Sequence, residues 1–295
     1  MMFARWNKLA VSSIRQVYPV ISDVTIEKDI FVAYRRNWSD KAAAPAVSPI
    51  NLTNMSNSHL PRGSAVHLEK LFWTEPCSLA LPLDSPDRIE QPQYTGIRRF
   101  ILKMLLYYSN PCKSFRGANV AYHRIVSQVK NRSIYEVFDL EPTFNMKYSL
   151  LVLHIWLFLR RVKQEGEEGV EFGQYLYEVY NLDKKMGVLK AKLRASNAGV
   201  KLLLTKWMKE SERIFYGNVF AYDQALLPES DPDELQKLLW RNVLYDDDES
   251  DPDANSIKTI QAMARYVRRE NACLSLTDKE DLFSGNFKFS SLTDT

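Results

Sequence analysis

The chain has 295 residues, 39 basic and 36 acidic side chains, and a net charge of +3. Hydrophobic residues make up 45% and charged residues 25%, a composition typical of a soluble globular protein. The charges are too balanced for the whole chain to bind nucleic acid, so any electrostatic contact must come from local patches. Cys77, Cys112 and Cys273 have neither metal-ligand nor redox spacing, which argues against a disulfide framework.

The N-terminal 40 residues are predicted to be a mitochondrial transit peptide. Residues 1–22 contain Arg5, Lys8 and Arg15 and no acid, and apolar side chains recur between them at helical spacing. A helix with one basic and one apolar side is typical of such a peptide. The alternative is a surface amphipathic helix of the mature protein. Residues 41–93, rich in Ala, Pro, Ser and Asn, predict a flexible linker, within which the apolar stretch 68–73 is expected to dock on the domain.

From residue 94 to 292 the sequence predicts one all-α domain, a helical bundle preceded by a disordered N-terminal leader. Apolar side chains recur there at helical spacing, while strand-like alternation is nearly absent. Local signals divide this pattern into separate helices. Helices are predicted to end at Pro111 and at Gly285. Helices are predicted to start at Ser114, Thr143, Asp231 and Asp251, and at the capping boxes Ser133/Glu136 and Thr277/Glu280. Phe287, Phe289 and Leu292 are expected to be extended.

The most hydrophobic stretch is 150–159, in which only His154 is not apolar. A membrane span needs ~20 apolar residues, and here Arg160 and Arg161 follow after half that length. The stretch therefore predicts the central buried helix of the bundle, with a membrane-inserted segment as the alternative. His154 is expected to be a hydrogen-bonded core residue.

No constellation of residues indicates catalysis. The four histidines are scattered, and no nucleophile, phosphate-binding or dinucleotide-binding motif occurs. The chain is therefore predicted not to be an enzyme and to hold no cofactor or metal. One acidic run, with Asp247 and Asp251 in a DDxxD pattern, is like the magnesium-binding motif of helical prenyl-diphosphate transferases. It lacks a second cluster on a facing helix, so a solvated loop is the preferred interpretation.

Two basic clusters are candidate contacts with the ribosome or a partner protein, because basic helix faces bind anionic surfaces. A solvated helix face is the alternative for each. The residues are Arg98, Arg99 and Lys103 in the first cluster, and Lys184, Lys185, Lys190 and Lys192 in the second.

Several long runs resemble the ubiquinol–cytochrome c reductase assembly chaperone family, in a form similar to plant members. They are LHIWLFLRR (153–161), EGVEFGQYLYEVYN (168–181), AGVKLLLTKWMKESERIFYGNVFAYDQALLPES (198–230), LWRNVLYDD (239–247) and MARYVRRENACLSLTDKEDLFSGNF (263–287). The resemblance covers about residues 94–292. The stretch 182–197 is longer than is usual in the family, which leaves the roles of its lysines open.

The resemblance implies an assembly factor of respiratory complex III on the matrix side of the mitochondrial inner membrane. Such a protein receives newly made cytochrome b near the exit of the mitochondrial ribosome, together with a small partner protein. Peripheral contact with the inner membrane is compatible with this role, and no small-molecule substrate is expected. A structural or RNA-binding protein of the mitochondrial ribosome is the alternative function.

The client groove is expected beside the hydrophobic helix, since a chaperone for apolar segments needs an apolar surface. Its candidate residues are Leu150, Leu153, Trp156 and Leu157. The aromatic residues of the matched runs are expected to be core residues rather than client contacts; these are Trp156, Trp207, Tyr216 and Trp240.

Overall fold

The computed structural model describes residues 68–90, 94–194, 198–244 and 253–292. The predicted transit peptide, most of the predicted linker and the DDxxD run lie outside these residues. The chain divides into two compact units, one of residues 1–58 and 92–113 and one of residues 59–91 and 114–295. The described residues are predominantly helical, as the sequence predicts.

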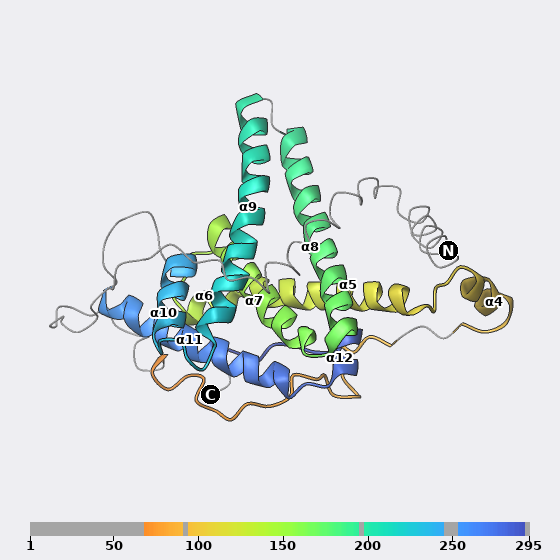
Figure 1. The fold of residues 1–295 in the computed structure, drawn as a ribbon, viewed down its shortest axis with the longest axis horizontal. Helices are drawn as coiled ribbons and strands as arrows, with labels where there is room; N and C mark the ends of the chain where they lie inside the picture. Colours follow the sequence, from red (N-terminus) through yellow and green to blue (C-terminus); the bar gives the residue numbers. More distant parts are fainter. Residues whose placement is uncertain (1–67, 91–93, 195–197, 245–252, 293–295) are drawn as a thin grey trace. The chain divides into compact units, whose positions relative to one another are not determined.

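At the centre of the larger unit lies helix α7 (Phe144–Lys163), the predicted hydrophobic helix (Figure 1). Its start is the predicted one, because the Thr143 hydroxyl accepts a hydrogen bond from the Met146 N–H at 3.2 Å. The side chains from 152 to 158 are all buried, which confirms the prediction of a central core helix. In the described part of the chain no helix is long and apolar enough to cross a membrane.

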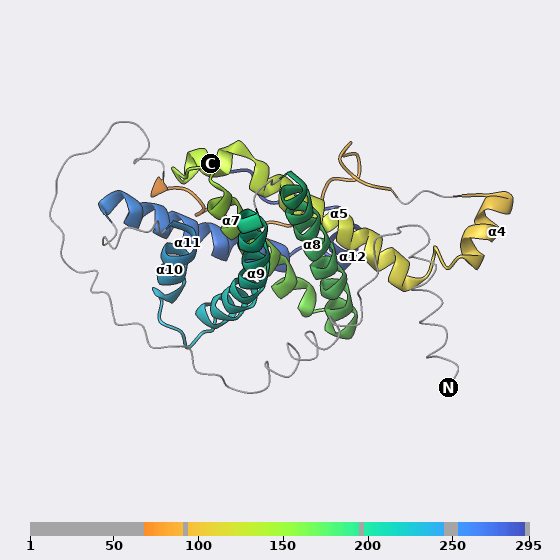
Figure 2. The ribbon, with the colours of Figure 1, turned by 90° about the horizontal axis from the view of Figure 1, so that it is seen from above.

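Helices α8 (Gly166–Arg194) and α9 (Ala198–Ala225) run side by side as a long pair, and both contact α7 (Figures 1 and 2). Helix α8 continues through residue 181 without a break. The reason is packing: Phe172, Leu176 and Tyr180 are fully buried on one side of this continuous helix. The long stretch 182–197 thus extends α8 up to Arg194.

The C-terminal part packs on the other side of α7 and consists of α10 (Glu234–Leu239), the π-helical turn η1 (Trp240–Leu244), α11 (Ala254–Ser275) and α12 (Lys279–Ser284). Gly285 ends α12 with a φ of +74°, as predicted, because glycine adopts this left-handed conformation without strain. Phe287 and Phe289 then follow as extended chain, as predicted, whereas Leu292 lies at a bend. All three side chains are buried.

Several predicted helix starts were wrong by a few residues. Helix α5 (Asn110–Lys130) begins before Ser114 and carries Pro111 in its first turn, where a proline costs no hydrogen bond. Helix α6 (Arg132–Val137) is capped by Asn131, whose side chain accepts from the Ser133 N–H at 3.1 Å. Helix α10 starts after Asp233 rather than Asp231.

Residues 68–90 pack against the C-terminal part of the same unit, which includes the docking predicted for 68–73. Leu68 and Leu71 are buried, and their carbonyl oxygens accept hydrogen bonds from the Arg265 guanidinium. Further along, the Leu81 N–H donates to the Asn286 carbonyl at 2.9 Å, beside an antiparallel bridge between Ala80 and Phe287. Residues 68–90, which belong to the predicted linker, therefore lie against the helices, and we call this segment the strap.

In the smaller unit the structure describes residues 94–113, which include helix α4 (Gly96–Met104) and the first residues of α5. The predicted pattern is present in α4, with apolar and basic side chains on different sides of the helix. No residue of α4 is buried.

Candidate functional site

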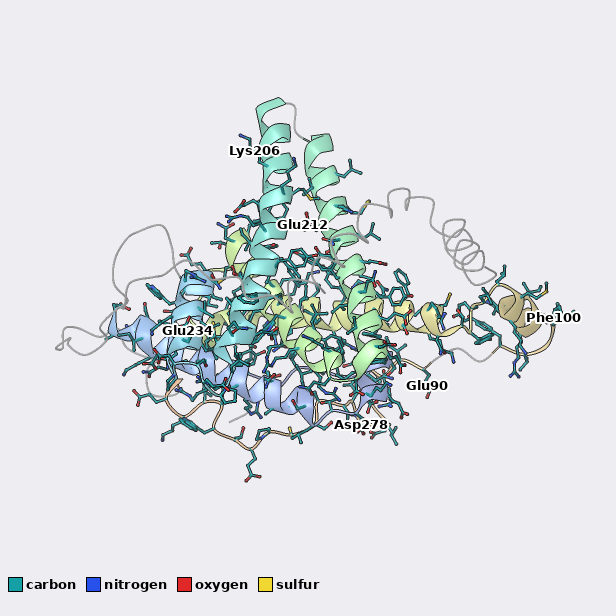
Figure 3. The ribbon with its side chains drawn as sticks, viewed as in Figure 1. Glu90, Phe100, Lys206, Glu212, Glu234 and Asp278 are labelled. Atoms are coloured by element: carbon teal, nitrogen blue, oxygen red, sulfur yellow. The ribbon has the colours of Figure 1, made fainter. Side chains whose placement is uncertain are left out.

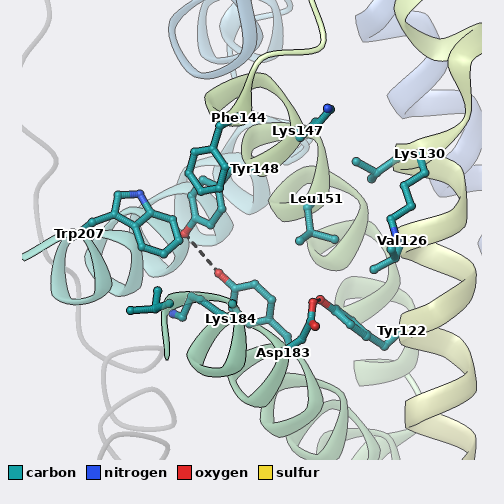
Figure 4. A pocket seen from close by; sticks show the side chains of 14 residues that line it. Tyr122, Val126, Lys130, Phe144, Lys147, Tyr148, Leu151, Asp183, Lys184 and Trp207 are labelled. Atoms are coloured by element: carbon teal, nitrogen blue, oxygen red, sulfur yellow. Dashed lines mark hydrogen bonds between the residues drawn. The ribbon is translucent and has the colours of Figure 1, made fainter. Parts of the chain in front are cut away.

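A pocket of about 710 Å³ opens in the larger unit between helices α5, α7, α8 and α9 (Figure 4). Apolar and aromatic side chains form most of its wall, and basic side chains lie at its edge. The lining residues include Val126 and Val129 of α5, Phe144, Tyr148 and Leu151 of α7, Tyr180 and Val188 of α8, and Trp207 of α9. A pocket of this size and composition is suited to binding apolar groups.

Three hydrogen bonds between helices hold the pocket walls together. The Tyr122 hydroxyl of α5 donates to the Asp183 carboxylate of α8 at 2.8 Å. The Tyr180 hydroxyl of α8 donates to the Tyr148 hydroxyl of α7 at 3.2 Å (Figure 4). The Tyr148 hydroxyl in turn donates to the Ser211 carbonyl of α9 at 2.6 Å. Four helices are thus linked around one cavity.

The tyrosine hydroxyls of the pocket remain protonated. Burial raises the pKa of Tyr122, and the adjacent Asp183 carboxylate raises it further. Burial is also the main cause of the raised pKa values of Tyr148 and Tyr180. These groups can fix the positions of helices, but they are not suited to exchange protons with a ligand near neutral pH.

Aromatic rings form the pocket edge nearest α9. The Trp207 ring lies 5.3 Å from that of Phe144 and 5.8 Å from that of Tyr148. Trp207 is only half-buried and Phe144 is 63% exposed. Trp207 is therefore part of an accessible surface rather than of the predicted core, and Tyr216 and Trp240 are half-buried as well. Trp156 is fully buried, as predicted.

Three lysines, Lys130, Lys147 and Lys184, surround the pocket, against one carboxylate, Asp183. The Lys184 ammonium lies 5.0 Å from the centre of the Tyr180 ring, which places it over an aromatic face. Lys130 and Lys147 are exposed. The edge of the pocket is therefore positively charged.

The residues predicted for the client groove lie elsewhere on the same helix. Leu150, Leu153, Trp156 and Leu157 are at most 1% exposed, so they belong to the core and do not line the pocket. The pocket instead uses the neighbouring side of α7. The sequence could not reveal this because 150–159 is apolar on all sides of the helix, so its pattern does not single out one face.

The predicted basic contacts are only partly brought together. Lys184 lines the pocket, and Lys185 is exposed one residue further along α8. Lys190 and Lys192 also belong to α8, but their side chains lie outside the described part of the structure. Arg98, Arg99 and Lys103 are exposed on α4 in the other unit.

No cluster of three or more His, Cys, Asp or Glu side chains with metal-binding geometry occurs among the described residues. His154 is a hydrogen-bonded core residue, as predicted. Its Nδ1 lies 2.7 Å from the Leu150 carbonyl oxygen and its Nε2 lies 2.8 Å from the Tyr266 hydroxyl.

The sequence model of the ubiquinol-cytochrome C chaperone family matches residues 136–289, just over half of the chain. The chain belongs to this family. The matched region contains α7 to α12, and so three of the elements that line the pocket.

Two relatives in this family are each named ubiquinol-cytochrome c reductase complex assembly factor 1. The Xenopus laevis protein is 29% identical over 166 residues, which are 55% of this chain and 74% of the relative. The human protein is 26% identical over 210 residues, which are 69% of this chain and 64% of the relative. The similarity thus spans about two thirds to three quarters of these relatives.

A crystal structure of the Cbp3 homolog from Brucella abortus is similar in fold. It superposes with a TM-score of 0.50 and 26% sequence identity, and the match covers 65% of this chain and 97% of the bacterial one.

Proposed function

We propose that this protein is a mitochondrial assembly factor for the ubiquinol–cytochrome c reductase complex, respiratory complex III, and that its pocket holds newly synthesised cytochrome b. Membership of the chaperone family and the names of its relatives support the role in assembly. The observation that carries the proposal for the client is the 710 Å³ apolar pocket, whose aromatic edge is accessible.

The physical basis is the poor solubility of an unassembled membrane segment. An apolar helix released from the ribosome exposes side chains that aggregate unless another surface covers them. A groove between helices can take the side chains on one face of such a segment. Phe144 and Trp207 lie where an incoming segment meets the pocket, and Leu151 lies behind them in its wall.

The proposed activity is binding and release, and no covalent bond is formed or broken. We place the protein on the matrix side of the inner membrane, near the exit of the mitochondrial ribosome, where it acts with a small partner protein. The exposed Lys185 and the rim residue Lys184 are the candidate contacts that adjoin the pocket. Their charge favours an anionic partner surface.

The proposal is tested by replacing the aromatic edge of the pocket. Cells that lack the protein are complemented with the Phe144→Ala/Trp207→Ala variant, and newly made cytochrome b is followed by pulse labelling of mitochondrial translation. We expect faster loss of labelled cytochrome b and less complex III on native gels. Both replaced side chains are accessible, so the core is spared, and an unchanged melting temperature of the purified variant checks this.

The matched control is Phe220→Ala/Leu276→Ala, which removes two apolar side chains that are 41% and 57% exposed and lie outside the pocket. It should complement fully. Normal cytochrome b and complex III in cells that carry the pocket variant would refute the proposal for this site. Constant stoichiometry with ribosomal subunits would instead favour the alternative of a structural protein of the mitochondrial ribosome.

A further inference from the structure

Helix α4 exposes an apolar surface that none of the described residues of its own unit, 94–113, covers. Its apolar side chains Ile97, Phe100 and Met104 are 80%, 65% and 71% exposed, and Ile101 and Leu105 are 49% and 58% exposed (Figure 3 labels Phe100). Single exposed apolar side chains are common on protein surfaces, but five within nine successive residues are a contiguous patch. Such a patch indicates an interaction surface.

The five side chains lie on one side of the helix. Their spacing of three, four, seven and eight residues is that of one apolar helix face. Arg98, Arg99 and Lys103 fall outside that face and are all exposed. A helix of nine residues is far too short to cross a bilayer, which takes ~20 residues. A short helix with one apolar and one basic side instead fits the plane of a membrane surface.

The charge around α4 is of one sign. The described residues of its unit, 94–113, carry four basic side chains (Arg98, Arg99, Lys103 and Lys113) and no acidic one. A second copy of this chain would bring like charges together at this surface, which disfavours self-association. An RNA backbone would satisfy the basic residues but would leave the apolar face in water. An anionic bilayer surface offers both negative head groups and an apolar layer beneath them.

Tyrosines flank the helix at both ends. The Arg98 guanidinium lies 4.1 Å from the centre of the Tyr94 ring, which precedes α4, and the Tyr94 and Tyr107 rings are 6.2 Å apart. Tyr108 follows with its ring 5.2 Å from that of Tyr107. Tyrosine is enriched at the boundary between lipid and water because its ring is apolar and its hydroxyl is polar.

We propose that α4 docks this protein on an anionic membrane surface, with Ile97, Phe100 and Met104 inserted below the head groups and Arg98, Arg99 and Lys103 in contact with them. This function is separate from the pocket and does not rest on the identity of the client. It gives the protein a means of staying at a membrane surface in which no helix needs to cross the bilayer.

The test is co-flotation of the full-length protein with phosphatidylcholine vesicles, in which either none or a third of the lipids are phosphatidylglycerol. All proteins carry Arg5→Gln, Lys8→Gln and Arg15→Gln, so that the basic N-terminal residues do not dominate binding. We expect binding to the anionic vesicles only. Replacing both Phe100 and Met104 by Ser should weaken it at least tenfold, since each loses its apolar burial.

Replacing the three basic residues of α4 by Gln should weaken binding by roughly a hundredfold at low salt. The controls are Leu83→Ser/Leu276→Ser for the apolar pair and Lys206→Gln/Lys209→Gln/Arg241→Gln for the charges, all at exposed positions outside α4. Both should bind like the parent protein.

Three results would overturn the proposal. The first is equal binding of the α4 variants and their controls. The second is binding that depends on the basic residues but not on Phe100 and Met104, which would indicate a purely electrostatic contact such as that with RNA. The third is a loss of self-association in the apolar variant without any change in vesicle binding, which would assign the face to a second copy.

Discussion

The buried histidine of α7 makes the stability of the helical unit dependent on pH. His154 is fully buried, and its Nδ1 faces the Leu150 carbonyl, which can only accept a hydrogen bond. Nδ1 therefore carries the proton, and Nε2 accepts from the Tyr266 hydroxyl. The Gln128 amide already donates to that hydroxyl at 3.2 Å. A second proton on the ring would turn Nε2 into a donor, so that the Tyr266 hydroxyl would lose its acceptor. Burial lowers the pKa of His154 to about 4.

The size of the effect follows from this pKa and from the value of ~6.5 for an unfolded histidine. Between the two values the unfolded chain binds a proton that the folded chain does not. The contribution to stability is therefore fully present above pH 6.5 and is lost as the pH falls toward 4. Between pH 7 and pH 5 the free energy of unfolding should fall by about 2 kcal/mol from this residue alone.

Urea unfolding, followed by circular dichroism at pH 7 and pH 5, measures this loss in the wild-type protein and in His154→Gln. The variant should be less stable at pH 7, but its loss between pH 7 and pH 5 should be smaller by about 2 kcal/mol. Burial raises the pKa of the nearby Glu270, which has the opposite pH dependence but is common to both proteins. The exposed His123→Gln serves as the control. Equal losses in wild type and His154→Gln would refute the reasoning.

Two further predictions concern close packing and a long-range hydrogen bond. Gly117→Ala should destabilise the protein by about 3 kcal/mol in urea unfolding, because its Cβ would lie 1.8 Å from the Phe283 carbonyl oxygen. The control Gly217→Ala has no heavy atom within 4 Å and should be neutral or stabilising by up to about 1 kcal/mol. Thr277→Val removes the acceptor of the buried Leu79 N–H and should cost about 1–3 kcal/mol, with faster proteolysis of the strap 68–90. Unchanged stability would contradict either prediction.

Where local chemistry decides, the sequence predicts the structure well. Thr143 and Gly285 were identified as a helix start and a helix stop, and both act in this way, because capping depends on residues within one turn. The apolar stretch 150–159 likewise predicted the core helix α7. These features need no knowledge of distant residues.

Thr277 is a residue whose hydrogen bonds could not be predicted from its neighbours in the sequence. The capping box predicted at Thr277 and Glu280 does not form, since the Thr277 hydroxyl accepts from the Leu79 N–H at 2.9 Å and donates to the Cys273 carbonyl at 2.8 Å. Leu79 lies 198 residues away along the chain. No local sequence pattern predicts this hydrogen bond, because it forms only when the strap packs on the helices.

The amino-acid pattern determined which side chains share a helix face, because that depends only on the period of the helix. It could not determine which faces are covered, because that depends on the other helices. On α7 the tertiary structure buried Leu150 and Trp156 and left Leu151 to line a pocket. On α4 the described residues of the same unit, 94–113, leave the apolar face, including Phe100, uncovered.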